Sequence, residues 1–162
     1  MSKLCSKICL IVVLSHVFAL AVPVQACENQ GLSTGQALYV PAYSHIYSAN
    51  NEEPFMLTVT LSIRNTDPHN QVRITRVDYY ETQGKLLKEY VDTAIVLGPL
   101  ESLRYVVPER DESGGSGANF IVEWVADKCT NPPIVESIMI GTQMQQGVSF
   151  ISHGQEIIDS EQ

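Results

Sequence analysis

The chain has 162 residues, of which 44% are hydrophobic and 17% are charged, and it carries a formal net charge of −8. This length suits one domain with one hydrophobic core. An acidic surface repels phosphate backbones, and the sequence contains no basic stripe with interleaved aromatic residues, so the composition argues against nucleic-acid binding.

The first 26 residues predict a secretory signal peptide. Lys3 and Lys7 form a positive start, Ile8–Val22 is apolar, and small residues stand at Val24 and Ala26. The apolar run of about 15 residues is shorter than the roughly 20 that span a bilayer, so no transmembrane segment is expected. Without this segment, eighteen acidic residues stand against eight basic ones, a formal net charge of −10.

Cys27 would be the first residue after cleavage, and it has two competing interpretations. It could carry lipid, as in a bacterial lipoprotein, or it could form a disulfide with Cys129 in an oxidising compartment. A lipidated Cys27 would leave Cys129 alone, so the two are exclusive. Both interpretations predict an exported, periplasmic protein, either soluble or lipid-anchored at Cys27.

The remaining chain predicts short strands separated by turns. Phe55–Arg64 alternates apolar and polar residues, which indicates a strand with one buried face. Val72–Tyr80 changes phase, which indicates either a β-bulge near Thr75 or Arg76 or burial on both faces, and Gly84 predicts a hairpin turn. Further strands are expected at Tyr39–Ile46, Leu86–Val91, Ile95–Leu97, Leu103–Val107, Phe120–Ala126, Ile134–Ile140 and Val148–Ile151.

This pattern predicts an all-β fold, an antiparallel β-sandwich of immunoglobulin-like type with about seven to eight short strands, or alternatively a small barrel. We expect an N-terminal linker at residues 27–36, a single β-sandwich domain at 37–154 and a mobile tail at 155–162. Tyr105 could serve as the corner tyrosine of immunoglobulin-like domains, a structural role.

Several segments together resemble a bacterial family named domain of unknown function 3124. The resemblance extends over roughly Gly35 to Gly154 and implies an exported bacterial protein. It supplies no activity, ligand or catalytic residue. The segments that carry it are "LYVPAYSHIY" (Leu38–Tyr47), "LTVTLSIRNTD" (Leu57–Asp67), "VDYYETQGK" (Val77–Lys85), "SGGSGANFIVEW" (Ser113–Trp124) and "IVESIMIGTQMQQGVSFISHG" (Ile134–Gly154).

The glycine-rich segment Gly114–Gly117 resembles a phosphate-binding loop or the elbow that presents a catalytic serine. Both of those motifs lead into a helix, whereas here Ala118 and Asn119 lead into a predicted strand. The glycines are therefore expected in a hairpin loop, where positive φ is needed. Asp111, Glu112 and Asn119 offer oxygen ligands for a weak calcium site, although their spacing is not that of an EF-hand.

The segment "YSHIY" places Tyr43, His45 and Tyr47 near an edge strand, and it is the candidate interaction surface. A zinc or copper site is the competing hypothesis, although the spacing of the donors is not typical of metal ligands. Its possible ligands are His45, His69, His153, Cys129, Met139 and Met144.

Glu123 and Glu136 interrupt two apolar strands. If these strands formed a hairpin in the right register, the two carboxylates would face each other and could act as acid and base. No catalytic constellation is complete, so the expected function is a non-enzymatic module, without cofactor, that binds a protein or envelope component. A metal-binding protein and, less favoured, a carboxylate-dependent hydrolase are the alternatives.

Overall fold

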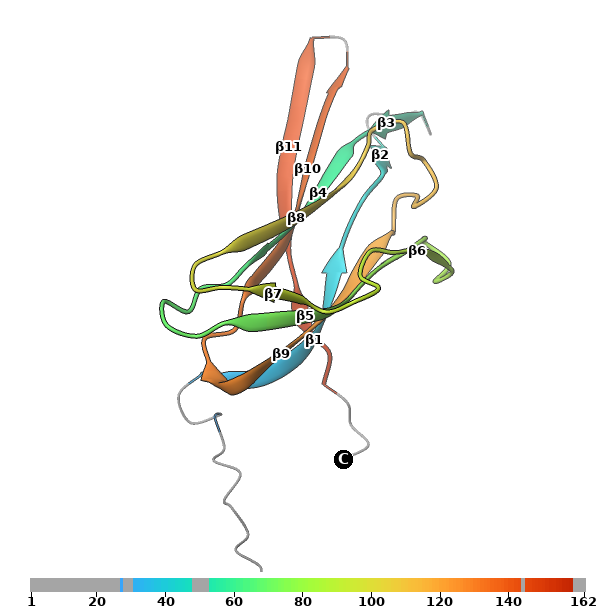
Figure 1. Cartoon of the computed structure of the whole chain (residues 1–162). Helices are drawn as coiled ribbons and strands as arrows, with labels where there is room; N and C mark the ends of the chain where they lie inside the picture. The colour runs from blue at the N-terminus through green and yellow to red at the C-terminus, as the bar shows by residue number, and fades with distance from the viewer. Residues whose placement is uncertain (1–26, 28–30, 48–52, 144, 159–162) are drawn as a thin grey trace, which may run out of the picture.

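The computed structural model describes residues 27, 31–47, 53–143 and 145–158 (Figure 1). In these ranges every regular element is a strand, and every pair of neighbouring strands runs antiparallel. The predicted signal peptide lies outside the described residues. The strands are β1 (Ser33–Pro41), β2 (His45–Tyr47), β3 (Pro54–Met56), β4 (Thr58–Arg64), β5 (Val72–Tyr80), β6 (Leu86–Glu89), β7 (Ile95–Leu97), β8 (Ser102–Val107), β9 (Asn119–Thr130), β10 (Ile134–Gln143), β11 (Gln146–His153) and β12 (Gln155–Glu156).

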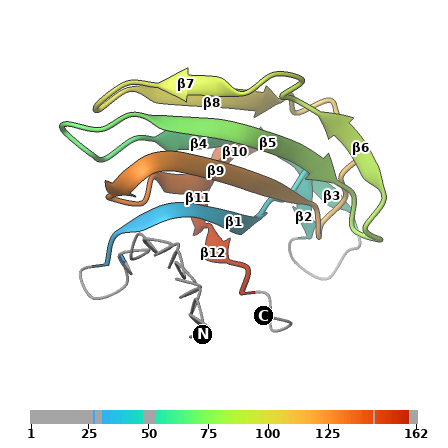
Figure 2. The same cartoon turned by 60° about the horizontal axis from the view of Figure 1, so that its bottom comes forward.

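The strands form two larger sheets and one small hairpin. The six-stranded sheet has the order β12-β1-β9-β5-β6, with β7 also paired to β5, and the four-stranded sheet has the order β11-β10-β4-β8. Strands β2 and β3 form the hairpin. Figure 2 shows β1, β9 and β5 in front of β11, β10 and β4. The prediction of an all-β, antiparallel fold is confirmed, whereas the expected seven to eight strands were too few.

One hydrophobic core lies between the two larger sheets. Val59, Leu61 and Ile63 of β4 are fully buried, which confirms the alternation predicted for this strand. From the other sheet, β9 contributes Phe120 and Trp124 to the same cluster. Because successive residues of a strand point to opposite faces, the residues between these positions lie on the outer faces of the sheets.

The segment predicted as one strand, Phe55–Arg64, is broken at Leu57. Its first part pairs with β2, and its second part belongs to the four-stranded sheet. At the break, the Leu57 N–H donates to the carbonyl of Ser44, 2.9 Å away, and this bond continues the register of β3 against β2. This contact lies between distant parts of the chain, so the local alternation does not contain it.

Two local predictions are confirmed in β5 and the turn after it. The register of β5 against β9 shifts between Ile74 and Arg76, so of the two explanations for the change of phase, the bulge near Thr75 is the one that the structure contains. Gly84 has a φ of +83°, as the hairpin turn requires.

The hairpin considered between the strands that contain Glu123 and Glu136 does not form. Strand β9 pairs with β1 and β5, whereas β10 pairs with β4 and β11, so the chain passes from one sheet to the other between them. The connection contains Pro132 and Pro133, which have no N–H to contribute to a ladder between the two strands.

The expected domain boundaries also shift. Strand β1 begins at Ser33, inside the predicted linker, and Gly35 lies so close to the Trp124 carbonyl that an added Cβ would come within 2.9 Å of it. At the other end, Gln155 and Glu156 form β12 against β1, so the first residues of the predicted tail belong to the sheet.

Tyr105 does not make the bond that defines a corner tyrosine. Its hydroxyl is buried and has no hydrogen-bond partner among the described residues. Its ring instead packs on Tyr90, with ring centroids 4.7 Å apart, and burial raises the pKa of Tyr105. The residue therefore contributes apolar packing rather than a backbone tether.

Candidate functional site

The β2–β3 hairpin presents two different faces. Ile46 lies opposite Phe55, which is buried in the core, so these two side chains point inward. His45 lies opposite Met56 and Tyr47 lies opposite Pro54, and directly opposed residues share one face of an antiparallel pair. We call the outward set, His45, Tyr47, Pro54 and Met56, the β2–β3 face.

His45 and Tyr47 support each other on this face. The Nε2 atom of His45 lies 3.2 Å from the Tyr47 hydroxyl, and their rings meet edge to face with centroids 5.2 Å apart. The Tyr47 side chain nevertheless remains 57% exposed. An aromatic ring that is fixed by a neighbour yet open to solvent is a common feature of binding surfaces.

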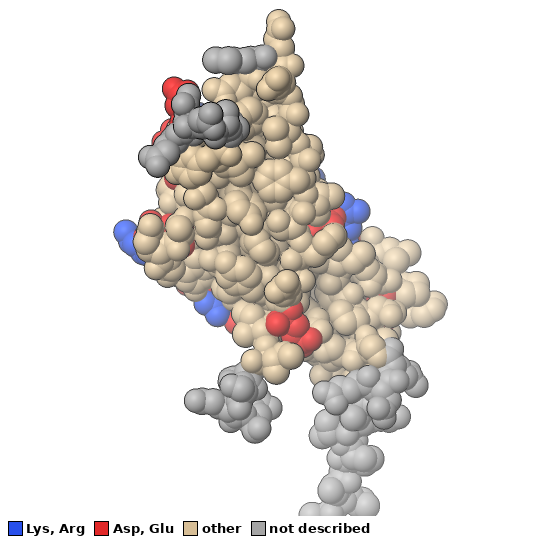
Figure 3. Space-filling view, turned by 180° about the vertical axis from the view of Figure 1, so that it is seen from behind, with Lys and Arg blue, Asp and Glu red and all other residues tan. Residues whose placement is uncertain are grey.

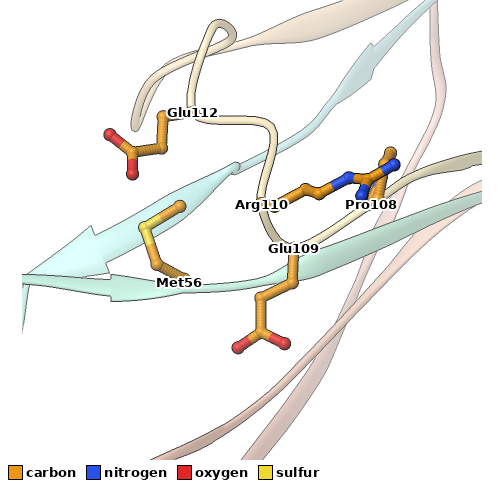
Figure 4. Close-up of a pocket in the computed structure, with 5 residues that line it drawn as sticks. All are labelled: Met56, Pro108, Glu109, Arg110 and Glu112. Carbon is orange, nitrogen blue, oxygen red and sulfur yellow. The ribbon is translucent and has the colours of Figure 1, made fainter.

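A shallow depression of about 480 Å³ adjoins the β2–β3 face (Figure 4). Met56 lines it from β3, and Pro108, Glu109, Arg110 and Glu112 line it from the segment that follows β8. The depression therefore combines an apolar thioether with two carboxylates and one guanidinium.

The segment after β8 crosses between the two sheets, which corrects the expectation of a hairpin loop. It leaves β8 in the four-stranded sheet and enters β9 in the six-stranded sheet. A short turn begins it, since the Asp111 N–H donates to the Pro108 carbonyl at 2.9 Å. The Asp111 carboxylate then accepts hydrogen bonds from the backbone N–H and the hydroxyl of Ser113.

The glycines of this segment allow close packing. A Cβ atom on Gly114 would overlap the hydroxyl of Tyr79, which lies 2.9 Å from the Ser44 hydroxyl. Burial raises the pKa of Tyr79, while its hydrogen bond to Ser44 opposes that shift. Gly115 has a φ of +76°, and its carbonyl accepts a hydrogen bond from the Ser44 N–H at 3.0 Å. The prediction of positive φ is confirmed at Gly115. Its hydrogen bond with Ser44, the residue before β2, holds the start of β2 against this loop.

Tyr43 lies apart from the other two predicted interaction residues. Its ring packs edge to face on Phe150 of β11, with centroids 5.7 Å apart, and it is half-buried. The structure therefore brings His45 and Tyr47 together on one surface and uses Tyr43 in packing.

The residues considered as metal ligands lie in different parts of the fold. His45 lies on β2, the His69 N–H donates to Asp67 in the loop after β4, and His153 lies 3.7 Å from the Glu136 carboxylate. No group of three or more His, Cys, Asp or Glu in the described part of the chain could hold a metal ion. Of the other candidates, Asn119 begins β9 opposite Pro41 and Tyr80, and Glu112 lines the depression. Met139 is fully buried in the core, and Cys129 forms a disulfide. Met144 lies outside the described residues.

Glu123 and Glu136 do not form a pair. Glu123 lies between the buried residues Val122 and Trp124, so it faces outward from the six-stranded sheet, and Glu136 faces outward from the four-stranded sheet in the same way. The two carboxylates therefore lie on the outer faces of different sheets, and the core separates them. This arrangement rules out the acid–base pair considered from the sequence.

Each of these glutamates has its own cationic partner. Arg76 donates hydrogen bonds to Glu123 at 2.9 Å, to Asp78 at 2.5 Å and to the Tyr80 hydroxyl at 2.7 Å. The bonds to the Glu123 and Asp78 carboxylates raise the pKa of Arg76. Glu136 lies 3.5 Å from Arg64. Glu123 therefore belongs to a largely satisfied surface network that the sequence alone did not indicate.

At the opposite end, the structure joins Cys27 and Cys129 in a disulfide whose Cα atoms are 5.6 Å apart. Nearby lies the buried carboxylate of Asp67, which accepts hydrogen bonds from Thr130 at 2.6 Å and from the Asn131 N–H at 3.1 Å. It also accepts bonds from the backbone N–H groups of His69 and Asn70, both at 2.8 Å.

The Thr130 hydrogen bond is the largest cause that holds the pKa of Asp67 well below its usual range, and burial opposes it. Sequence reasoning assigned no role to Asp67. Its partners Thr130 and Asn131 are far away along the chain, so the local sequence around Asp67 does not reveal them.

Comparisons with known proteins give a family but no activity. The family model described as "Protein of unknown function (DUF3124)" matches residues 35–157. Comparison with curated proteins gave no match. A solved structure described as "Crystal Structure of Thermotoga maritima 1070" is similar at 11% identity and a TM-score of 0.42, over 74% of this chain and 92% of that chain. None of the described residues forms a helix that is long and apolar enough to cross a membrane.

Proposed function

The chain belongs to the DUF3124 family, and from that premise we propose that it is a non-enzymatic, exported binding module of the cell envelope. Its partner in this proposal is a protein or another envelope component. The observation that carries the proposal is the β2–β3 face with the depression beside it.

The chemistry of this surface favours a partner with an apolar group next to a positive charge. Tyr47 and Met56 offer an exposed ring and a flexible thioether, which adapt well to apolar side chains. Glu109 and Glu112 line the same depression and outnumber the cation there, Arg110, so the excess of negative charge would attract a cation. The excess of acidic residues outside the first 26 positions would also steer a basic partner toward the molecule.

The finer description of the fold belongs to the same proposal. Two antiparallel sheets with one shared core support an immunoglobulin-like β-sandwich. In such folds the loops at the ends of the sheets commonly bind partners. The hairpin β2–β3 and the segment after β8 hold a position of this kind.

Export to the periplasm is supported by the first 26 residues of the sequence and by the Cys27–Cys129 disulfide, because such bonds persist in oxidising compartments. The same sulfur atom of Cys27 would carry a lipid anchor, so the disulfide favours the soluble form. The intact mass of the exported protein tests this point. We expect a chain that begins at Cys27 and is two hydrogen atoms lighter than its reduced form. A mass that includes acyl chains would contradict the soluble form.

Site-specific crosslinking in intact cells tests the binding function. A photoreactive amino acid in place of Tyr47 should give a discrete adduct with one envelope component. The same substitution at Leu100, which is 67% exposed, serves as the control and should not give that adduct. Identical adducts at both positions, or none at Tyr47, would overturn the proposal.

Charge reversal sharpens the same experiment. The double variant Glu109→Lys and Glu112→Lys should remove the Tyr47 adduct while it leaves the fold intact, because both residues are exposed. Reversal of Glu89 and Asp92, which are exposed and do not line the depression, is the matched control. An adduct that survives the first double variant would show that the carboxylates do not recognise the partner.

A further inference from the structure

Strand β11 forms one edge of the four-stranded sheet, and it pairs only with β10 among the described residues. The hydrogen bond from the Gly154 N–H to the Val135 carbonyl, 2.8 Å long, continues the β10–β11 register. Backbone groups alternate in direction along an antiparallel strand. Therefore the even-numbered residues of β11 bond toward β10, and Gly147, Ser149, Ile151 and His153 turn their N–H and C=O groups outward.

Within the described part of the chain, this edge lacks the usual protection against pairing with another strand. Exposed edges in proteins are normally interrupted by Lys, Pro or a bulge. Strand β11 extends over 8 residues without Lys or Pro, and its register against β10 has no shift.

The side chains around the edge would gain from a further strand. Ile151 lies opposite Ile138 on the outer face of the sheet, and both Ile151 and Ile140 are 52% exposed. On the core side, Val148 and Phe150 are only half-buried at the end of the sheet. A strand added beside β11 would cover apolar groups on both faces.

The distribution of charge points to a second copy of the chain as the occupant. The segment Ser137–Gln155 contains no Asp, Glu, Lys or Arg, although the molecule as a whole is strongly acidic. Figure 3 shows the projecting β10–β11 hairpin, at the top, without blue or red atoms. Two acidic molecules repel each other over most of their surfaces, but two β11 strands would bring no like charges face to face.

We propose that the protein forms a two-fold symmetric dimer through antiparallel pairing of β11 with β11 of a second copy. Such pairing is self-complementary, because the same outward groups at positions 147, 149, 151 and 153 supply donors and acceptors on both sides. The two four-stranded sheets become one continuous sheet. This inference does not depend on the proposed binding function, since the β2–β3 face takes no part in the pairing.

Sedimentation equilibrium of the purified full chain over a wide concentration range tests the proposal. The wild type should dimerise, and Ser149→Pro should raise the dimer dissociation constant at least about tenfold, because it removes an outward N–H at the centre of β11. Ser102→Pro is the matched control. Its N–H also points away from the sheet, at the opposite edge on β8, so it should leave dimerisation unchanged.

Two further measurements keep the test decisive. Ser149→Lys retains the backbone donor but places a cation in each copy, so it should weaken the dimer even if the proline variant fails to fold. Hydrogen exchange should slow at the amides of Ser149 and Ile151 as concentration rises. A monomeric wild type would overturn the proposal and leave this edge open to an extended peptide from another protein. A dimer in which those amides exchange as in the monomer would overturn it as well.

Discussion

The two ends of the molecule are held together in different ways. The disulfide end, defined by Cys27, Asp67, Cys129 and Thr130, combines a covalent bond with a buried carboxylate that accepts several hydrogen bonds. The β2–β3 end, defined by the β2–β3 face and the segment 108–118, is fastened by close packing around glycine and by single backbone hydrogen bonds. Figure 1 shows β2 and β3 near the top and the end of β9 near the bottom.

This difference suggests that the disulfide end stabilises the fold and that the β2–β3 end binds a partner. A buried carboxylate with several donors fixes the chain in one arrangement, and losing it is costly because the donors remain buried. An exposed aromatic ring contributes little to stability and is free to contact a partner. Mutations at the disulfide end should therefore change the free energy of unfolding, and mutations on the β2–β3 face should change binding.

Loss of the disulfide should have the largest effect. The bond joins residues separated by 102 positions, and closing a loop of that size removes much entropy from the unfolded chain. The double variant Cys27→Ala and Cys129→Ala should lower the free energy of unfolding by about 4 kcal/mol. Urea unfolding with and without reductant measures this. A change below about 1 kcal/mol would contradict it, because the bond would then add little.

Removal of the Asp67 carboxylate should be next in size. Asp67→Ala leaves the buried Thr130 hydroxyl and several backbone N–H groups without an acceptor, so we expect a loss of about 3 kcal/mol in urea unfolding. Asp127→Ala is the control, because that side chain is 68% exposed and forms one ion pair, with Arg73. The control should cost less than about 1 kcal/mol. Equal losses would refute a special role for Asp67.

The same carboxylate should make stability depend on acid pH. Its folded pKa is lowered, so its contribution is fully present above the unfolded pKa near 3.9 and disappears as the pH falls through the folded pKa. The urea midpoint of the wild type should therefore decrease more steeply below about pH 4 than that of Asp67→Ala. Parallel curves for the two proteins would show that Asp67 is not the group responsible.

A methyl group at Gly114 tests the packing of the β2–β3 end. The added Cβ would overlap the Tyr79 hydroxyl and crowd Ser44, which should cost about 1 to 2 kcal/mol. Gly147→Ala is the matched control, since no atom of the described residues lies within 4 Å of its added Cβ. If Gly114→Ala unfolds at the same urea concentration as the control, the contact with Tyr79 is not restrictive.

The smallest effect on stability is expected at Tyr47. This side chain is 57% exposed and, among the described residues, bonds to His45 alone, so Tyr47→Ala should change the free energy of unfolding by less than about 0.5 kcal/mol. The same variant should weaken binding of the envelope partner. A large loss of stability without loss of binding would show that Tyr47 stabilises the fold and does not bind the partner.

The features that depend on local sequence were predictable. The alternation of apolar and polar residues indicated the buried face of β4, and the change of phase in β5 indicated the bulge near Thr75. Gly84 indicated the turn in which it lies. Each of these depends on the conformation of a few neighbouring residues.

The order of the strands in the sheets was harder to predict from the sequence. Only a short connection separates β9 from β10, which favours a hairpin, yet the chain turns there into the other sheet. Asp67 binds Thr130 and Asn131 at this point, and a partner 63 residues away leaves no periodic signal in either segment. The outward positions of Glu123 and Glu136 follow from that crossing.

The candidate site was half predicted for the same reason. His45 and Tyr47 are close in the chain and were recognised together, whereas Met56 and Glu109 join them only through the β2–β3 pairing and the crossing segment after β8. Tyr43 shows the reverse error. It belongs to the same sequence motif as His45 and Tyr47, but its ring packs edge to face on Phe150 of β11, which is distant in the chain.

The crossing of β9 toward Cys129 has a consequence for how the molecule is oriented when it is attached to something else. Cys27 is bonded to Cys129 next to the end of β9, far from β2 and β3 in Figure 1. In the proposed soluble form the mature chain begins at Cys27, so its N-terminus lies at this end of the molecule. A molecule immobilised through that N-terminus would present the β2–β3 face away from the support.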